Sequence, residues 1–289
     1  MAFDPARLLA LPPRETRARY DSRDAILYAL GLGVGLESAT DPATLSLAYE
    51  EGLQVLPTIC SVLATPGFWM RDPEHGIDWK RVLHGEESLE FHAPLPASGE
   101  IASRLTIEDV FDKGKEKGAM VYTRRELYDP STKRVLATER RSILLKGDGG
   151  KGGRTDASPL VPTVPDRSPD YSVSLVTAPN QALLYRLCAD PNPLHVDPAV
   201  ASAAGFQKPI LHGLCTYGIA GRALLATLCG NDVRLFRRMD CRFSAPVYPG
   251  DTIVTDIWHT DPHTAAFRAR VQARDVVVLN NGRFQYDVS

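Results

Sequence analysis

The sequence predicts an α+β fold in which one unit, a helix wrapped by a curled antiparallel sheet, occurs twice. Three observations lead to this prediction. A short motif recurs at an offset of 152 residues, a glycine-rich segment separates the two halves, and each half has a helix-spaced apolar segment followed by strand-like runs. A repeated order of helix and antiparallel strands is typical of a duplicated α+β unit.

The repeat is clearest in two proline-containing motifs. Phe-His-Ala-Pro-Leu-Pro at residues 91–96 is echoed by Phe-Ser-Ala-Pro-Val-Tyr at residues 243–248, and glycine, an acidic residue and isoleucine follow each. Pro57 and Pro209 stand at the same offset, each before an apolar segment. Together these matches favour a duplicated unit.

Apolar residues at helical spacing indicate one helical region in each half. They occur at residues 27–33 and 55–63 in the first half and at residues 214–228 in the second. Intervals of three or four residues put such side chains on one face of a helix. Gly218 and Gly221 would let the second-half helix lie close against a sheet.

Three strand-like runs follow the helical region in each half. They occupy residues 100–111, 119–128, 134–145, 252–259, 265–273 and 276–288. Asn281-Gly282 alone would suggest a hairpin in the last run. Its counterpart in the first half is unbroken, so we predict one long strand with a local irregularity.

A glycine-rich segment divides the chain. Residues 146–153 contain five glycines, and a Pro- and Ser-rich run continues to Pro169. So many glycines cannot hold a helix or strand, and no Gly-Lys-Ser/Thr sequence follows that would make a phosphate-binding loop. We predict an N-terminal unit at 1–146, a linker at 147–169 and a C-terminal unit at 170–289.

Composition and charge narrow the class of protein. Apolar residues make up 44% of the chain, which is typical of a globular protein. The net charge is −2, so we expect no electrostatic field that would attract nucleic acid or an anionic membrane. The five cysteines have no Cys-x-x-Cys spacing, so we expect reduced thiols and no metal site. We see no signal peptide, peroxisomal tail or apolar run of about 20 residues, and we therefore expect a cytoplasmic protein.

One segment carries candidate chemistry. Asp190-Pro-Asn-Pro-Leu-His195 is held rigid by two prolines and presents a carboxylate, an amide and an imidazole. Gly213, preceded by His212, opens the apolar helix, where free backbone N–H groups and the helix dipole favour negative charge. An acid–base site and a purely structural loop both remain open from these residues alone.

This segment resembles the hydratase motif of R-specific (type 2) enoyl-CoA hydratases and MaoC-like dehydratases. Those families carry Asp-x-Asn-Pro-Leu-His followed by Phe-x-x-Pro-Ile-Leu-His-Gly-Leu, as at residues 190–195 and 206–214 here. The likeness covers nearly the whole chain, in the double hot-dog form of the hydratase unit of peroxisomal multifunctional enzyme type 2. It implies reversible hydration of trans-2-enoyl-CoA to (3R)-3-hydroxyacyl-CoA in fatty acyl-CoA metabolism.

The resemblance also implies roles for individual residues. Asp190 and His195 match the catalytic pair, the N–H of Gly213 matches the donor to the thioester oxygen, and Asn192 would orient the water or Asp190. We expect His212 only to shape the turn before the helix. Positions that contact the substrate or its CoA portion are matched by His84, Gly85, Lys113 and Phe243. Structural roles for His84 in a turn, Lys113 on the surface and Phe243 in the core remain alternatives.

The first half lacks the catalytic pair. When residues 41–46 are aligned with 190–195, Ser46 stands where the second half has a histidine. We therefore expect the first half to bind the acyl chain. No metal or cofactor is expected beyond the CoA of the substrate, and family habit implies a homodimer.

Several alternatives stay open. Pro191 and Cys188-Ala189 depart from the commonest pattern of the motif, which leaves the preferred chain length in doubt. The alternative functions are a dehydratase for a carrier-protein-bound or specialised acyl thioester, a hot-dog thioesterase, and a non-catalytic acyl-CoA-binding protein. The pathway and the favoured direction also stay open.

Overall fold

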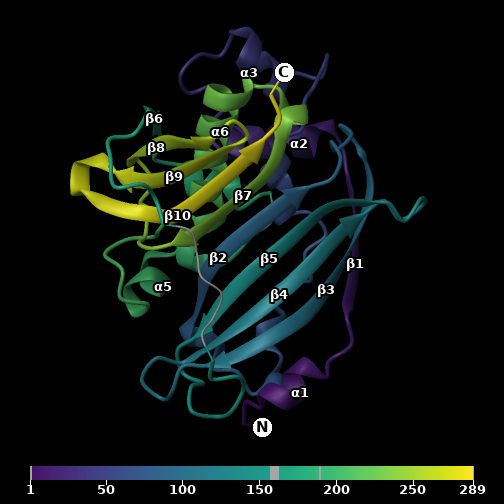
Figure 1. Cartoon of the computed structure of the whole chain (residues 1–289), viewed down its shortest axis with the longest axis vertical. Coiled ribbons are helices and arrows are strands. Elements are labelled where there is room, and N and C mark those ends of the chain that lie inside the picture. The colour runs from purple at the N-terminus through teal and green to yellow at the C-terminus, as the bar shows by residue number, and fades with distance from the viewer. Residues whose placement is uncertain (1, 157–162, 189, 289) are drawn as a thin grey trace.

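A single antiparallel sheet runs through the molecule (Figure 1). The computed structural model describes residues 2–156, 163–188 and 190–288. Within them, ten strands lie in the order β1-β3-β4-β5-β2-β7-β10-β9-β8-β6. The first five strands come from the N-terminal half and the last five from the C-terminal half. Both halves have the same internal order, so the predicted duplication and the double hot-dog fold are confirmed.

The strand bounds match the six predicted runs closely. The N-terminal strands are β1 (Arg14–Tyr20), β2 (Val82–Phe91), β3 (Gly99–Asp112), β4 (Ala119–Tyr128) and β5 (Val135–Leu145). The C-terminal strands are β6 (Tyr171–Val176), β7 (Phe236–Phe243), β8 (Thr252–Asp261), β9 (Thr264–Val271) and β10 (Val276–Tyr286). The two edge strands, β1 and β6, and the two central strands, β2 and β7, were not predicted.

The central strands escaped notice because charged residues interrupt their apolar pattern. β2 and β7 pair with each other and join the two halves of the sheet. In this seam Glu86 stands opposite Arg242, and Glu90 stands opposite Arg238. Opposite charges on facing strands stabilise the pairing. The sequence of either strand alone does not reveal this partnership.

Strand β10 is continuous, as predicted. It runs past Asn281-Gly282, where its register shifts relative to both neighbouring strands, β7 and β9. Asn281 has a left-handed φ of 55°. A Cβ atom at Gly282 would lie 2.4 Å from the carbonyl oxygen of Phe267, so only glycine fits there. The local irregularity is therefore a bulge, and no hairpin forms.

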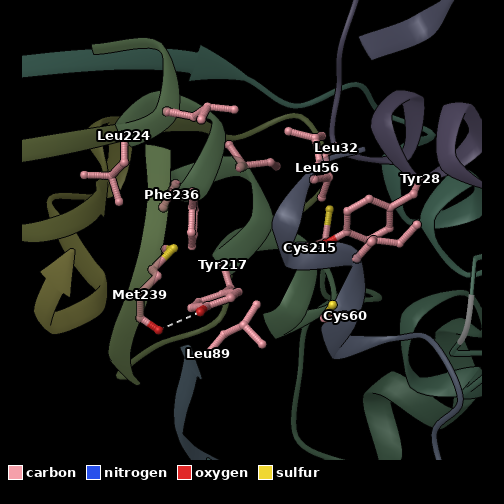
Figure 2. Packing of buried hydrophobic residues seen from close by; sticks show 14 of the residues in the cluster. Tyr28, Leu32, Leu56, Cys60, Leu89, Cys215, Tyr217, Leu224, Phe236 and Met239 are labelled. Carbon is pink, nitrogen blue, oxygen red and sulfur yellow. Dashed lines mark hydrogen bonds between the residues drawn. The ribbon is translucent and has the colours of Figure 1, made fainter. Parts of the chain in front are cut away.

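Helix α6 (Gly213–Cys229) is the long helix around which the C-terminal strands curl. It packs on β7, β8 and β10, and the Tyr217 hydroxyl donates to the carbonyl of Met239 at 2.8 Å (Figure 2). A Cβ at Gly218 would lie 2.6 Å from the side chain of Leu32, so this glycine permits the close approach. Tyr28, Leu32, Leu56 and Cys60 of the N-terminal half line the same core (Figure 2).

The N-terminal unit has no equally long helix among the described residues, which corrects one prediction. Of the two expected helical segments, 27–33 only overlaps the end of α2 (Ser22–Gly31), and 55–63 forms the short 3₁₀ turn η1 (Pro57–Ser61). The counterpart of α6 would occupy residues 61–77. Proline at 66 and 73 and left-handed φ angles at Ala64 and Gly67 break a helix there.

Short helices connect the strands. They are α1 (Pro5–Leu9), α3 (Pro42–Ala48), η2 (Trp69–Arg71), η3 (Pro73–His75), η4 (Trp79–Arg81), α4 (Gln181–Tyr185), η5 (Pro193–His195), α5 (Pro198–Ala203), η6 (Val233–Leu235) and η7 (Gln272–Arg274). α2 packs against α4, so the two units also meet beside the loop that follows α4. None of the described helices has the length and apolar character needed to cross a bilayer.

The first part of the predicted linker packs on the N-terminal unit. Asp148 is buried, and its carboxylate accepts hydrogen bonds from the backbone of Asp78 and the ammonium group of Lys151. The carboxylate of Asp112 accepts from the backbone of Gly150 and Gly152. Residues 157–162 of the predicted linker lie outside the described residues.

Candidate active site

His195 is a buried histidine with a defined tautomer. About 8% of its surface is exposed, and its Nδ1 atom lies 2.8 Å from the carbonyl oxygen of Ile210. A carbonyl oxygen can only accept a hydrogen bond, so Nδ1 carries the proton and Nε2 keeps a free lone pair. Nε2 is therefore the atom that can take a proton from a bound molecule.

The carboxylate of Asp190 faces that lone pair. Its Oδ2 atom lies 4.0 Å from Nε2 of His195. This separation is too long for a direct hydrogen bond, but both atoms can bind one oxygen atom placed between them. The structure thus brings together the two residues that the sequence motif singled out.

A tight turn holds Asp190 in place. The backbone N–H of Asn192 donates to Oδ1 of Asp190 at 3.0 Å. The side-chain oxygen of Asn192 in turn accepts from the backbone N–H of Leu194 at 3.1 Å. Prolines at 191 and 193 restrict the backbone on both sides of Asn192. Asn192 therefore orients the carboxylate through its main chain and the turn through its side chain.

Burial controls the charge of His195. It lowers the pKa of His195 below the ordinary value, while the Ile210 carbonyl and the Asp190 carboxylate oppose that shift. The imidazole is therefore neutral at pH 7, as a general base must be before it takes a proton.

Gly213 begins helix α6, so its backbone N–H has no partner within the helix. The helix dipole adds partial positive charge at this end. A Cβ at Gly213 would lie 3.2 Å from the ring of Phe243, so the ring covers the bare face of the glycine. The ring of His84 lies on Phe243 with a centroid distance of 4.5 Å. Two predicted substrate-contact residues therefore meet at the predicted oxyanion donor.

His84 is held by a buried carboxylate that was not among the predicted site residues. Its Nε2 atom lies 3.0 Å from Oε2 of Glu87, whose side chain is fully buried. Arg141 and the hydroxyl of Ser61 donate to the same carboxylate. Burial opposes the ionisation of Glu87, but Arg141 and His84 outweigh it and lower the pKa of Glu87 to about 2. The N-terminal unit thus presents a carboxylate–imidazole pair of its own beside Phe243.

Gly85 and Lys113 are placed differently from His84. A Cβ at Gly85 would lie 2.7 Å from the hydroxyl of Ser142, so Gly85 lets β2 bulge against β5. Lys113 is exposed in the turn after β3, at the same end of the sheet as His84. Three strand spacings, about 14 Å, separate β2 from β3. Contacts of Gly85 and Lys113 with substrate stay predictions.

His212 lies in the site, although only a role in the turn before the helix was predicted for it. Its ring stacks on that of His195 with a centroid distance of 3.7 Å and an interplanar angle of 26°. Its Nε2 atom lies 3.1 Å from the carbonyl oxygen of Asp190. The only sequence signal for this was its place beside Gly213, because the stack joins residues 17 positions apart.

Asp190, His195 and His212 also have the composition of a metal site. Imidazole lone pairs lie in the plane of the ring, and the two rings here lie nearly face to face. Their lone pairs therefore cannot converge on one ion without a rearrangement of the stack. The geometry suits proton transfer better than metal ligation.

Comparison with known proteins places this chain in a family. A model of the MaoC like domain matches residues 161–281, and a model of the MFE-2 hydratase 2 N-terminal domain matches residues 19–147. The chain is 40% identical to 3-hydroxyacyl-thioester dehydratase Y of Mycobacterium tuberculosis, over 99% of both chains. The chain belongs to the MaoC-like family.

Two further relatives of this MaoC-like chain support the same placement. Enoyl-CoA hydratase ChsH3 of Mycobacterium tuberculosis is 41% identical, over 93% of each chain. The crystal structure of a MaoC-like dehydratase from Phytophthora capsici is 32% identical, with a TM-score of 0.86 over 98% of this chain and 99% of that one. The resemblance drawn from residues 190–195 and 206–214 is thus confirmed.

Proposed function

We propose that this MaoC-like chain hydrates trans-2-enoyl-CoA reversibly to (3R)-3-hydroxyacyl-CoA, as a hydro-lyase of fatty acid metabolism. The observation that carries the proposal is the placement of the bare Nε2 of His195 4.0 Å from the carboxylate of Asp190. Relatives named as an enoyl-CoA hydratase and as a 3-hydroxyacyl-thioester dehydratase support the same reaction in its two directions.

The site supplies each step of this reaction. A water molecule between Asp190 and His195 loses a proton to Nε2 of His195 while its oxygen bonds to the β-carbon. The electrons of the double bond move to the thioester oxygen, which the N–H of Gly213 stabilises by about 3–4 kcal/mol if it resembles other oxyanion donors. The imidazolium then returns the proton to the α-carbon, and the carboxylate of Asp190 stabilises the transient cation. No metal or cofactor takes part in these steps.

The N-terminal unit would hold the acyl chain. A cavity of about 180 Å³ lies between β1, α2 and η1 of this unit. Apolar side chains of Leu27, Ile59 and Val62 line it, and Cys188, two residues before Asp190, lies on its wall. An acyl chain that leaves the catalytic loop on this side would enter the cavity.

We also propose that the chain forms a homodimer in the cytoplasm. The five cysteines are all free, which suits a reducing compartment. A mass twice that of the chain in light scattering would support the dimer, and a monomeric mass would contradict it.

The test follows the absorbance of the conjugated thioester with trans-2-enoyl-CoAs of 4, 8 and 16 carbons, and then the configuration of the product. We expect loss of absorbance and a 3R product. A 3S product contradicts the assignment, and release of free thiol without loss of the enone would instead indicate a thioesterase. Activity only on carrier-protein thioesters would mean that the acyl group is carried by a protein and not by CoA. Binding without turnover would indicate an acyl-CoA-binding protein.

A further inference from the structure

His212 holds the loop that carries Asp190. Its Nε2 atom lies 3.1 Å from the carbonyl oxygen of Asp190, and since that oxygen can only accept, Nε2 carries the proton. Nδ1 is buried and accepts no hydrogen bond from any part of the chain that the structure describes. A second proton on Nδ1 would find no acceptor, so His212 donates to Asp190 as a neutral ring.

His212 also fixes the ring of His195. The hydrogen bond from Nδ1 of His195 to Ile210 sets the tautomer and holds one edge of the ring. The face of His212 stacks on this ring with a centroid distance of 3.7 Å and blocks its tilt toward that side. With the ring held, Nε2 of His195 stays at the distance from Asp190 at which both can bind one water molecule.

These contacts all come from one short segment of the chain. Ile210 supplies the carbonyl that orients His195, His212 supplies the ring and the donor, and Gly213 supplies the N–H at the start of α6. Segment 210–213 therefore sets the positions of the base, the carboxylate and the oxyanion donor relative to one another. An error of about 1 Å in these relative positions can reduce the rate on the order of 100-fold.

The surroundings of His212 keep it neutral. Burial, and then the neighbouring His195, lower the pKa of His212 to about 4. The titratable and charged groups that face it come from the end of α4, the catalytic loop and η5: Tyr185, Arg186, Asp190 and His195. A neutral ring can lie against His195 both before and after His195 takes a proton.

We propose that His212 is a positioning residue for the hydration reaction, one that fixes Asp190 through its backbone carbonyl and His195 through ring stacking. This inference rests on the proposed function, and a wild-type chain that hydrates no enoyl thioester would refute that function without testing His212. The two contacts can be removed one at a time, because one uses the donor atom and the other uses the ring.

His212→Phe keeps a ring against His195 and loses the donor to Asp190. With an 8-carbon trans-2-enoyl-CoA, we expect kcat to fall on the order of 100-fold, with KM changed less than about threefold. The acid limb of the pH profile should stay where the wild type has it, because His195 remains covered.

His212→Gln keeps a donor at about the position of Nε2 and loses the ring. We expect kcat on the pH plateau to recover to within about tenfold of the wild type. The acid limb should move up toward the ordinary histidine pKa of about 6.5, because water reaches His195. A purely structural role for His212 would not move this limb.

His75→Phe is the matched control. His75 is also buried, contacts an aromatic ring, that of Trp69, and lies 2.8 Å from a polar partner, Arg14, but it stands outside the site. Its kcat and pH profile should match the wild type, and thermal unfolding of all three variants reports their folding.

The inference is overturned if His212→Phe keeps kcat within twofold, if its loss of kcat is equalled in His75→Phe, or if His212→Gln leaves the acid limb in place.

Discussion

At the scale of single residues, burial sets the charge of the histidines in the site. Burial lowers the pKa values of both His195 and His212, that of His212 to about 4. Histidines in the unfolded chain take protons near pH 6.5, so between pH 6.5 and about 4 the unfolded chain binds more protons than the folded one. The free energy of unfolding should therefore decrease as the pH falls through this range.

This pH dependence can be assigned to His212. Urea unfolding of the wild type should show a lower free energy at pH 5 than at pH 7, and His212→Phe should show a smaller difference because it removes one such histidine. The same difference in both proteins would mean that His212 titrates normally in the folded chain.

The sequence revealed part of the residue-scale picture. Asp190, His195 and Gly213 could be found because one contiguous motif carries the first two and a helix start carries the third. The role of His212 depends on a ring stack with His195, 17 positions away, and that of Glu87 on contacts with Arg141 and Ser61, which lie on other elements. No local pattern in the sequence encodes such contacts.

At the scale of elements, a buried ionic cluster supports strand β2 beside the site. Arg141 of β5 donates to Glu87 of β2 and to Glu139, and both carboxylates are buried. Arg141→Met should destabilise the fold by about 3–5 kcal/mol, because it removes the guanidinium group that neutralises the buried carboxylate of Glu87. Arg140→Met is the control, since Arg140 is largely exposed and its ion pairs are worth about 1 kcal/mol or less. Equal losses in urea unfolding would contradict the account.

Helix α2 provides the test of the acyl cavity. Leu27 lines the cavity, so Leu27→Trp should reduce kcat/KM for the 16-carbon substrate at least tenfold while sparing the 4-carbon one. Leu30→Trp, on the exposed side of the same helix, should leave both rates unchanged. A uniform loss with both chain lengths in Leu27→Trp would place the acyl chain elsewhere.

Elements were predicted well where a simple period governs them. Six strands and the long helix α6 follow their apolar spacing. The expected helix at 55–63 failed, because Pro57 and the left-handed Ala64 limit this segment to one short turn. The cavity between β1, α2 and η1 lies beside this segment.

At the scale of the whole molecule, both units contribute residues to the candidate site. The C-terminal unit supplies Asp190, His195 and Gly213, and the N-terminal unit supplies His84 across the β2–β7 seam. The repeat in the sequence predicted two units of common origin. It could not show that His84 and Glu87 bring a second carboxylate–imidazole pair to the same place, because only the pairing of β2 with β7 does so.

We infer that Asp190 and His195 share one water molecule and move its proton. Asp190→Asn and His195→Gln remove the carboxylate and the base with little change in shape, and Asp197→Asn, at the cap of α5, is a control in which asparagine can still cap.

The decisive measurement is the rate of hydration of an 8-carbon trans-2-enoyl-CoA by these variants, with thermal unfolding recorded for each. We predict losses of about 10²–10⁴-fold or more for Asp190→Asn and His195→Gln, at unchanged unfolding temperature, and a normal rate for Asp197→Asn. A near-normal rate in either site variant would contradict this inference.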